Sequence, residues 1–366
     1  MRVNLFINTL CSGGAEHQAT MLADMLVEAG HDVTITTFTR LPDHYSYSPK
    51  IRRVCLDKGG QSKPVRMLKI WRYLLSTPDD AVILFGQGET RLGLPPLLMR
   101  PRRRRPVVII GERSLNTALP GRLGDFFFRR LYPKADAIVP NSSAQGRFLA
   151  ENYPALEGKI HVVNNYTDLA AFRFDPARPL PNRDVCVVAR FHEVKNGRRL
   201  VEALRMFKEK YGAALRLDWY GAIRVKSGEP SAEYSAMAAK IEEYGLGDII
   251  RLHDAVHDVP AVLASHGAFC LASVFEGFSN SIAEATCCGK VCLVSAVSDN
   301  PVMVSEGVNG FLFDPQSVES IFAAFERYHL TPDAELAAMA AASRRRAESL
   351  FDPARFLGGY TSLMNK

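Results

Sequence analysis

Residues 3–37 read VNLFINTLCSGGAEHQATMLADMLVEAGHDVTITT, and this stretch decides the fold class. Val3–Thr9 is predominantly apolar and predicts a buried strand. Glu16–Ala29 repeats apolar residues at helical spacing, and Gly30 ends the expected helix. Asp32–Thr37 is rich in β-branched residues and predicts a second strand. A strand, a helix and a strand in this order are typical of a parallel sheet with crossover helices.

The same alternation continues along the chain of 366 residues and predicts two α/β domains. Further strands are expected at Ala81–Phe85, Val107–Gly111, Ala137–Pro140, Asp184–Ala189, Arg216–Tyr220, Ile249–Leu252, Ala268–Ala272 and Val291–Ser295. Helices are expected in the second half at Gly197–Tyr211, Glu233–Tyr244, Val259–Ser265 and Ser281–Cys288. Phe172–Asn182 contains three prolines and no periodicity, which predicts an interdomain linker.

The composition is that of an ordinary globular protein, with 47% hydrophobic and 23% charged residues. The seven cysteines are odd in number and lie mostly in apolar runs, which favours free thiols in a reducing compartment. Met1–Leu10 does not have the pattern of a signal peptide, and no apolar run has the length of a membrane span. We therefore expect a cytoplasmic protein.

The net charge of +6 is unevenly distributed. Arg100 and Arg102–Arg105 form one dense run, and Leu123–Tyr132 is an apolar cluster flanked by arginines. The run predicts either a solvated loop or peripheral contact with the cytoplasmic face of an anionic membrane. The apolar cluster is either a core helix or part of that contact. No nucleic-acid-binding motif accompanies the charge, so nucleic acid is not an expected partner.

The loop after the first expected strand contains Gly13 and Gly14. Paired glycines between a strand and a helix allow backbone N–H groups to approach an anion at the helix N-terminus. A plain tight turn is the alternative. The spacing is not G-x-G-x-x-G, and no acidic residue ends the second strand, so a dinucleotide site is disfavoured.

Arg190 and Lys195 follow the first strand of the second half. An arginine binds phosphate through two hydrogen bonds, and a lysine adds a point charge. A nucleoside diphosphate that leaves a sugar needs such neutralisation as its bond breaks. The alternative is a solvated pair of surface cations.

The segment FEGFSNSIAEA at residues 275–285 places Glu276 in a loop and Glu284 in the next helix. Carboxylates accept hydrogen bonds from vicinal hydroxyls such as those of sugars and riboses. The backbone N–H groups of residues 277–281 can hold a diphosphate or a sugar oxygen. Asn280 or Ser281 is the expected helix cap, and a capping box with Ser281 is the alternative role for Glu284.

Together these motifs resemble the retaining glycosyltransferases of family 4, which have the GT-B fold. The resemblance covers nearly the whole chain, from Gly-Gly-Ala-Glu at residues 13–16 to Asn-Gly-Phe-Leu-Phe at residues 309–313. It implies two Rossmann-like parallel-sheet domains that face a central cleft. Residues 1–174 would form the acceptor-side domain, and residues 175–350 would bind the nucleotide sugar. Residues 351–366 would form a terminal helix that crosses back to the first domain.

The resemblance also implies roles for the residues of the three loops. Glu276 would contact the donor sugar as a catalytic residue, while the catalytic cations Arg190 and Lys195 would hold the diphosphate. Glu284 would bind the ribose. The other donor-binding residues would be Gly13, Gly14, Gly277, Phe278, Ser279, Asn280 and Ser281.

Many relatives carry a histidine in the first domain near the sugar, and residues 111–116, GERSLN, lack it. Some bacterial surface-polysaccharide members are similar to this pattern. Glu112, Arg113 and Asn116 are therefore the acceptor-side candidates. A structural ion pair is the alternative for Glu112 and Arg113.

The resulting prediction is a retaining hexosyltransferase that acts in cell-surface polysaccharide synthesis. It would move a sugar from a nucleotide diphosphate sugar to a glycan or a lipid diphosphate-linked acceptor. No cofactor and no metal are expected, and the chain has no Asp-x-Asp motif of the kind that metal-dependent transferases use. A nucleotide-sugar epimerase on the same fold and a non-catalytic nucleotide-sugar-binding scaffold are the alternatives.

Overall fold

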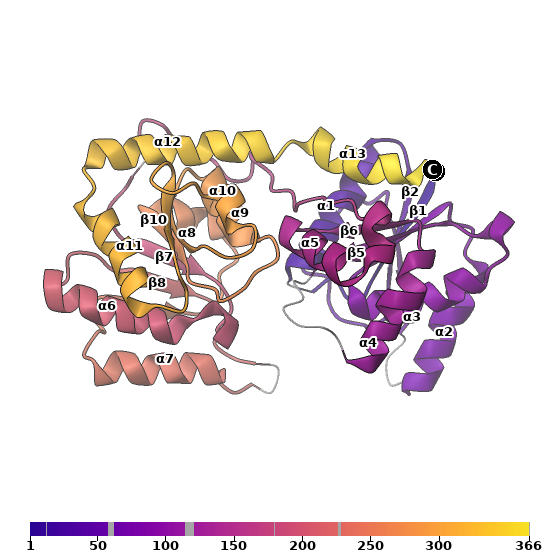
Figure 1. Cartoon of the computed structure of the whole chain (residues 1–366), viewed down its shortest axis with the longest axis horizontal. Helices are drawn as coiled ribbons and strands as arrows, with labels where there is room; N and C mark the ends of the chain where they lie inside the picture. The colour runs from indigo at the N-terminus through magenta and orange to yellow at the C-terminus, as the bar shows by residue number, and fades with distance from the viewer. Residues whose placement is uncertain (12, 58–61, 114–120, 179, 226–227, 366) are drawn as a thin grey trace. The chain divides into compact units, whose positions relative to one another are not determined.

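The computed structural model describes residues 1–11, 13–57, 62–113, 121–178, 180–225 and 228–365 (Figure 1). Its internal contacts divide the chain into two compact units. Unit 1 comprises Met1–Tyr166 and Pro353–Lys366, and unit 2 comprises Thr167–Asp352. Each unit is built around its own parallel sheet.

Unit 1 contains a six-stranded sheet with the order β3-β2-β1-β4-β5-β6. Its strands are β1 (Arg2–Ile7), β2 (Asp32–Thr37), β3 (Arg52–Cys55), β4 (Ala81–Phe85), β5 (Val107–Glu112) and β6 (Ala137–Pro140). Its helices are α1 (Gly14–Glu28), α2 (Lys63–Ser76), α3 (Gln87–Met99), α4 (Arg122–Phe126), α5 (Ser143–Asn152) and α13 (Pro353–Met364). The C-terminal helix α13 packs against α1 and therefore belongs to the unit that begins the chain.

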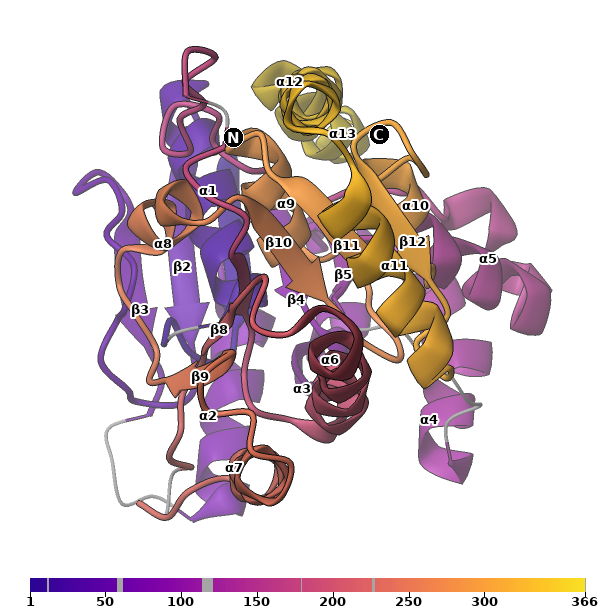
Figure 2. The same ribbon diagram turned by 90° about the vertical axis from the view of Figure 1, so that its left-hand side faces the viewer.

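Unit 2 repeats this architecture with the order β12-β11-β10-β7-β8-β9. Its strands are β7 (Val185–Val188), β8 (Leu217–Tyr220), β9 (Ile250–His253), β10 (Ala268–Leu271), β11 (Val291–Ser295) and β12 (Gly310–Phe313). Its helices are α6 (Gly197–Tyr211), α7 (Ala232–Glu243), α8 (Val259–Ser265), α9 (Asn280–Cys287), α10 (Asn300–Met303), α11 (Val318–Leu330) and α12 (Asp333–Leu350). Figures 1 and 2 show α6 and α7 on one side of this sheet and α9 and α12 on the other.

Both sheets are covered on their two faces, as the composition of their strands requires. Every residue of β4 and of β11 is buried. A parallel strand that is covered on both sides reads as a continuous apolar run, because neither face meets water. Several helices begin after a side chain that accepts a hydrogen bond from the first turn, which stabilises the helix start. These caps are Ser142, Ser231, Asp258, Ser279 and Ser317.

The strand order reverses at one point in each sheet, and this point positions the candidate site. In unit 1, β1 lies between β2 and β4, and in unit 2, β7 lies between β8 and β10. Loops that leave the carboxyl ends of such neighbouring strands run to opposite faces of the sheet and leave a crevice for a ligand. The loops after β7 and β10, which contain the predicted donor-binding residues, therefore meet at the switch point of unit 2.

The prediction of two Rossmann-like parallel-sheet domains is confirmed. Strands β2, β4, β6 and β11 have the bounds expected from the sequence. The short strand β3 and the helices α2, α11 and α12 were not expected. Among the described residues, no helix is both long enough and apolar enough to cross a lipid bilayer.

Candidate active site

An ion pair joins the two loops at the switch point of unit 2. The Lys195 ammonium contacts the Glu276 carboxylate, although the two residues are 81 positions apart in the chain. Their side chains are only 18% and 13% exposed, so water screens the pair weakly. The structure thus brings together two of the three residues that the sequence predicts to be catalytic.

A single 3₁₀ turn after β7 presents Lys195 to this position. The turn spans Glu193–Lys195 and is capped by the His192 ring, whose Nδ1 accepts a hydrogen bond from the backbone N–H of Val194 at 3.3 Å. Asn196 then takes the left-handed conformation (φ 60°), and its side chain donates to the carbonyl of Pro315 at 2.8 Å. His192 is therefore a structural cap of this loop.

The loop after β10 is fastened to the same turn, and this fixes Glu276. The backbone N–H of Val274 donates to the carbonyl of Val194 at 2.9 Å. The Ser273 hydroxyl donates to Oε1 of Glu276 at 2.6 Å, the oxygen that also contacts Lys195. Ser273 is fully buried and was not predicted as a site residue. Ser273 lies in the same loop as Glu276, and its hydroxyl positions the Glu276 carboxylate.

The start of helix α9 differs from the expectation. Ser279, and not Asn280 or Ser281, is the cap, and its hydroxyl accepts a hydrogen bond from the backbone N–H of Ile282 at 3.5 Å. The prediction of the cap was therefore wrong by one or two residues. The capping box between Ser281 and Glu284 does not form, because a cap at Ser279 places Glu284 beyond the first turn.

Glu284 is left with a carboxyl group that receives no hydrogen bond or ion pair from the part of the chain that the structure describes. Burial raises the pKa of this carboxyl to about 8. The Glu284 side chain is half-buried, and a carboxyl group that loses water without gaining a partner is disfavoured. Such groups are characteristic of ligand-binding positions. The geometry favours the binding role over the structural role for this residue.

Gly277 and Phe278 shape the loop between the two glutamates. The Ser298 hydroxyl donates to the carbonyl of Gly277 at 3.0 Å. Phe278 is buried, and its ring meets the edge of Phe351 with a centroid distance of 6.2 Å. The Phe278 side chain therefore packs in the core of unit 2, so that only its backbone could face a donor.

Arg190 lies on the same loop as Lys195 but is not part of the ion pair. Its side chain is exposed, and it forms no ion pair with any described residue. The preceding residue is anchored, since the indole Nε1 of Trp219 donates to the carbonyl of Ala189 at 2.8 Å. A fixed backbone with a free guanidinium group leaves Arg190 available to an anionic ligand.

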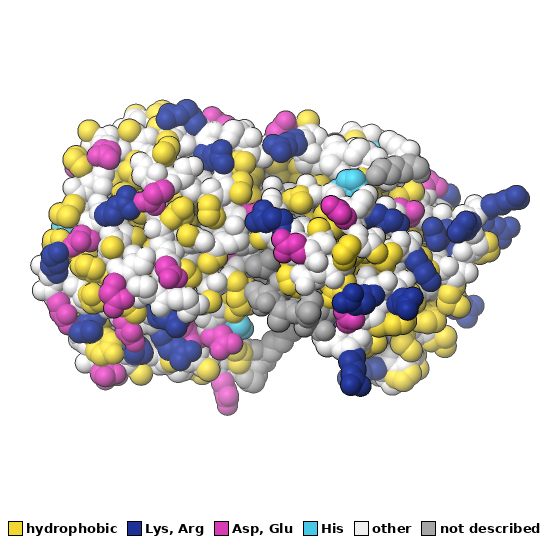
Figure 3. Space-filling model, in the orientation of Figure 1, with side chains coloured by type: hydrophobic (Ala, Val, Ile, Leu, Met, Phe, Trp, Pro, Cys, Tyr) yellow, Lys and Arg dark blue, Asp and Glu magenta, His cyan; other side chains and the backbone are white. Residues whose placement is uncertain are grey.

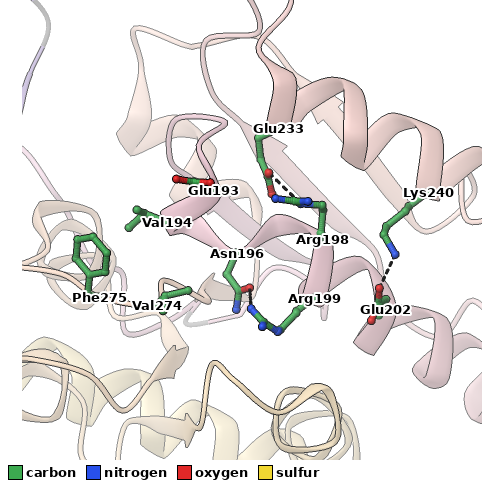
Figure 4. Close-up of a pocket in the computed structure, with 10 residues that line it drawn as sticks. All are labelled: Glu193, Val194, Asn196, Arg198, Arg199, Glu202, Glu233, Lys240, Val274 and Phe275. Carbon is green, nitrogen blue, oxygen red and sulfur yellow. Dashed lines mark hydrogen bonds and ion pairs between the residues drawn. The ribbon is translucent and has the colours of Figure 1, made fainter. Parts of the chain in front are cut away.

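A cavity of about 620 Å³ lies next to the two loops (Figure 4). It is lined by Glu193, Val194, Asn196, Arg198, Arg199, Glu202, Glu233, Lys240, Val274 and Phe275. Figure 4 shows an apolar end, formed by Val194, Val274 and Phe275, and a charged end on α6 and α7. The charged end is internally paired: Nε of Arg198 lies 3.1 Å from Oε2 of Glu233, and Lys240 contacts Glu202. Its ion pairs stabilise the α6–α7 contact.

In unit 1, Gly13 contacts the side chains of Tyr45 and Glu16. The Tyr45 hydroxyl lies 3.3 Å from the Gly13 nitrogen and 3.2 Å from the Gly13 carbonyl oxygen. Glu16 lies in the first turn of α1, and its carboxylate stands against the side of Gly13 where a Cβ atom would be. A carboxylate there repels phosphate, so the assignment of Gly13 and Gly14 to the diphosphate stays a prediction.

Glu89, a residue that the sequence analysis did not single out, lies at the switch point of unit 1. It follows β4, and its Oε1 accepts a hydrogen bond from the backbone N–H of Asn8 at 3.1 Å. Burial raises the pKa of Glu89 to about 7, and the carboxylates of Glu16 and Glu112 contribute to the shift. The signal was present in the sequence, because Glu89 comes four residues after the end of the expected strand Ala81–Phe85.

The adjacent Glu112 and Arg113 at the end of β5 do not form the ion pair that was the alternative for them, and each has other partners within unit 1. Glu112 accepts hydrogen bonds from the Tyr132 hydroxyl at 2.5 Å and from the side chain of Gln87 at 3.1 Å. Burial raises the pKa of the Glu112 carboxyl. The Arg113 guanidinium lies over the Phe85 ring at 4.5 Å.

Arg113 also joins β5 to the C-terminal helix, because its guanidinium donates to the hydroxyl of Tyr360 in α13. Its Nε atom is buried without a hydrogen-bond partner. Asn116, the third acceptor-side candidate, lies outside the described residues. Within the described residues, no three His, Cys, Asp or Glu side chains converge as metal ligands would.

Two family models match the chain and together span residues 12–346. Residues 12–171 match Glycosyltransferase Family 4, and residues 170–346 match Glycosyl transferases group 1. The boundary between the two matches falls close to the division between the two structural units.

Curated relatives of known activity are similar to parts of the chain. The N-acetylgalactosamine-N,N'-diacetylbacillosaminyl-diphospho-undecaprenol 4-alpha-N-acetylgalactosaminyltransferase of Campylobacter jejuni is 28% identical over 185 residues, which are 50% of this chain and 46% of that protein. The MMP alpha-(1->4)-mannosyltransferase of Mycolicibacterium hassiacum is 25% identical over 226 residues, which are 61% of this chain and 52% of that protein. The matched segments span about half the length of these two relatives.

Solved structures are similar to the chain over its full length. A glycosyltransferase from Rickettsia africae aligns with a TM-score of 0.80 at 16% identity, covering 100% of this chain and 97% of that one. Anabaena Alr3699/HepE, in complex with UDP and glucose, aligns with a TM-score of 0.80 at 16% identity and covers 100% and 99%. At this identity the likeness shows the fold. With two family models in the expected order and the GT-B fold around them, the chain belongs to the family 4 type of GT-B glycosyltransferases.

Proposed function

We propose that this protein is a glycosyltransferase that moves a sugar from a nucleotide diphosphate donor to a glycan or lipid-linked acceptor with retention of configuration. The observation that carries the proposal is the Lys195–Glu276 ion pair, together with the unpartnered carboxyl of Glu284 in the helix that follows the Glu276 loop. Cation, carboxylate and free carboxyl lie at the switch point of unit 2, where open α/β sheets bind their ligands.

The donor would bind by replacing Glu276 as the partner of Lys195. A diphosphate that binds Lys195 competes with Glu276 for the same ammonium group. Glu276, still held by Ser273, then becomes free to accept hydrogen bonds from hydroxyl groups of the sugar. Arg190 adds a second cation from the same loop. Together the cations stabilise the diphosphate as the bond to the anomeric carbon breaks.

Glu284 suits the ribose of the donor. Its carboxyl has no competing partner among the described residues, and a largely protonated carboxyl both donates and accepts hydrogen bonds. The N–H groups of Asn280 and Ser281 lie at the start of α9, the helix that contains Glu284, and favour an anionic oxygen. Ser279 caps the same helix and so contributes to the donor site through its position.

The relatives support the substrate classes of the proposal. The name of the Campylobacter relative describes transfer to a diphospho-undecaprenol-linked glycan, and the Anabaena structures contain UDP and UDP-glucose. A lipid diphosphate-linked acceptor and a uridine donor are accordingly the first substrates to test. Transfer without a metal and a role in cell-surface polysaccharide synthesis belong to the same proposal.

A donor screen followed by product analysis tests the proposal. A nucleotide sugar that binds should raise the melting temperature by mass action. The donor so identified is then incubated with polyprenyl-diphosphate acceptors, and the anomeric configuration of the product is read by NMR. An α-linked product from an α-linked donor supports retention, whereas a β-linked product would contradict it. Formation of an epimer of the nucleotide sugar without any acceptor would instead show epimerase activity.

A further inference from the structure

The net positive charge of the protein comes entirely from unit 1. Unit 1 contains 25 lysine and arginine residues against 14 aspartate and glutamate residues, whereas unit 2 contains 20 against 25. The whole chain has a net charge of only +6. Unit 1 is thus strongly basic, and the nucleotide-binding candidate lies on the acidic unit.

Within unit 1 the charge is concentrated in three segments, which we call the basic–apolar surface: Lys63–Ser76, Met99–Arg105 and Arg122–Lys134. They contain thirteen basic residues and one acidic residue, Asp125, so the remainder of unit 1 is close to neutral. Several of the cations are exposed and form no ion pair with any described residue. These are Arg102, Arg103, Arg104, Arg122 and Arg130.

Helix α2 turns apolar side chains toward solvent. Ile70 and Leu74 are buried against the unit, and they are the only buried residues of this helix. Val65, Leu68 and Leu75 recur at intervals of three and seven residues and therefore form one stripe. That stripe is opposite the buried pair, and Leu68 is 70% exposed. A helix packed only on one side would place polar residues at these positions.

Two further elements of the basic–apolar surface expose large apolar side chains. Leu123 and Phe126, three residues apart in α4, are 64% and 52% exposed. Met99, at the end of α3, is 65% exposed. Met99 is followed by Arg100 and Leu123 is preceded by Arg122, so apolar side chains and cations are neighbours in the sequence of these segments.

The segments of the surface are held together by direct contacts. Helix α2 packs along α3, and α3 contacts the turn Phe127–Leu131 that continues α4. The Arg100 guanidinium donates to the carbonyl of Leu74 at 3.3 Å, which fastens the arginine run to α2. In Figures 1 and 2, α2 and α4 both lie at the lower edge of this unit. Figure 3 shows hydrophobic side chains between lysines and arginines over the same region.

We propose that the basic–apolar surface docks unit 1 on an anionic lipid bilayer. The exposed apolar side chains would enter the boundary between headgroups and acyl chains, and the surrounding cations would bind anionic headgroups. A second copy of the chain is a poorer occupant, because two surfaces of the same strong charge repel each other. This inference rests on unit 1 alone and goes beyond the transfer reaction, so failure of either proposal leaves the other testable.

Flotation of the full chain with vesicles tests the electrostatic part. The vesicles consist of phosphatidylcholine alone or of phosphatidylcholine with phosphatidylglycerol, at low and at high salt. We expect recovery with the anionic vesicles that falls at high salt, since salt screens surface charge. The triple variant Arg102→Gln, Arg103→Gln, Arg104→Gln should partition on the order of 100-fold less, because each cation near an anionic surface contributes about fivefold.

A matched control distinguishes this surface from charge in general. Three exposed arginines of unit 2, Arg173, Arg178 and Arg345, are replaced by glutamine in the control variant. The control should bind anionic vesicles at least as well as the parent chain. Equal loss in both triple variants, or equal recovery with neutral and anionic vesicles, would overturn the proposal.

The apolar part is tested by the double variant Leu68→Gln, Leu123→Gln, with Val308→Gln, Leu330→Gln of unit 2 as the control. All four side chains are exposed, so the melting temperatures should match that of the parent. We expect the first variant to lose most of its vesicle binding and the control to keep it. A first variant that binds vesicles normally but changes a dimeric parent into a monomer would show that a second copy covers this surface, which would refute the bilayer assignment.

Discussion

The ammonium of Lys195 and the carboxylate of Glu276 neutralise each other at the carboxyl ends of β7 and β10. Each charge is mostly buried and depends on the other, because an isolated charge in such a position is strongly disfavoured. The free protein therefore holds its principal cation and its principal carboxylate in one closed pair, which a ligand has to open.

We predict that Lys195→Met and Glu276→Gln are strongly non-additive in stability. Each single change leaves one charge without its counter-ion, and the double change removes both charges. The coupling between the two positions should be about 1–3 kcal/mol. Chemical denaturation in a Trp71→Phe background measures it, since Trp219 in the core of unit 2 is then the only tryptophan. Losses that simply add would show that the pair contributes nothing in solution.

Substitution of Glu276 and substitution of Glu284 should impair different steps, catalysis in the first case and nucleotide binding in the second. Glu276→Gln keeps the size of the side chain but removes the charge next to the sugar, so turnover should fall more than nucleotide affinity. Glu284→Gln should weaken binding of the free nucleoside diphosphate and of the nucleotide sugar alike. Calorimetric titration of the nucleoside diphosphate into both variants separates the effects. The reverse pattern, with diphosphate binding lost in Glu276→Gln and kept in Glu284→Gln, would exchange the two assignments.

The Glu284 carboxyl should make the stability of the protein depend on pH. Its pKa is about 8 in the folded protein and about 4.3 in an unfolded chain. The folded protein therefore holds this proton more tightly than the unfolded chain does. The resulting contribution to the free energy of unfolding is fully present below pH 4 and is lost as the pH rises toward 8. In the parent chain this lowers the free energy of unfolding by up to about 1.4 kcal/mol per pH unit, and Glu284→Gln does not undergo this decrease. The variant should therefore melt above the parent at pH 8 and close to it at pH 5.

The exposed Glu243 of α7 provides the matched control for this measurement. Glu243→Gln should melt with the parent at both pH values. A constant difference between Glu284→Gln and the parent from pH 5 to pH 8 would contradict the raised pKa.

Transfer should continue in the presence of a metal chelator. Lys195 and Arg190 already supply two positive charges from the loop after β7, and this is the neutralisation that a divalent ion provides in metal-dependent transferases. Turnover with the identified donor is measured before and after treatment with EDTA. Activity that disappears in EDTA and returns with magnesium would disprove metal independence.

The sequence predicted best those elements that are buried on both faces. Strands β4 and β11 are continuous apolar runs, so their bounds follow from composition alone. Strand β3 contains two arginines and lies at the edge of its sheet, where only one neighbour pairs with it. Helix α2 was missed because its exposed apolar stripe obscures the single face that packs.

The sequence predicted which residues belong to the site, but not which of them contact each other. Strand-end position pointed to Lys195 and Glu276, but their pairing depends on how two loops 81 residues apart are tied together by Val194 and Val274. Ser279, Asn280 and Ser281 all have side chains that suit a helix cap, so the sequence alone did not select Ser279. Glu89 could have been found, because the strand-end rule that selected Glu276 applies equally to it.

The return of α13 to unit 1 has a consequence for synthesis of the chain on the ribosome. Unit 2 is one uninterrupted segment, Thr167–Asp352, and has all its elements as soon as that segment has emerged. Unit 1 lacks the helix that supplies Tyr360 to Arg113 until residues after 352 have been made. Although it begins the chain, unit 1 is the later of the two to be completed, and the nascent protein would lack the packing of α13 on α1 throughout the synthesis of unit 2.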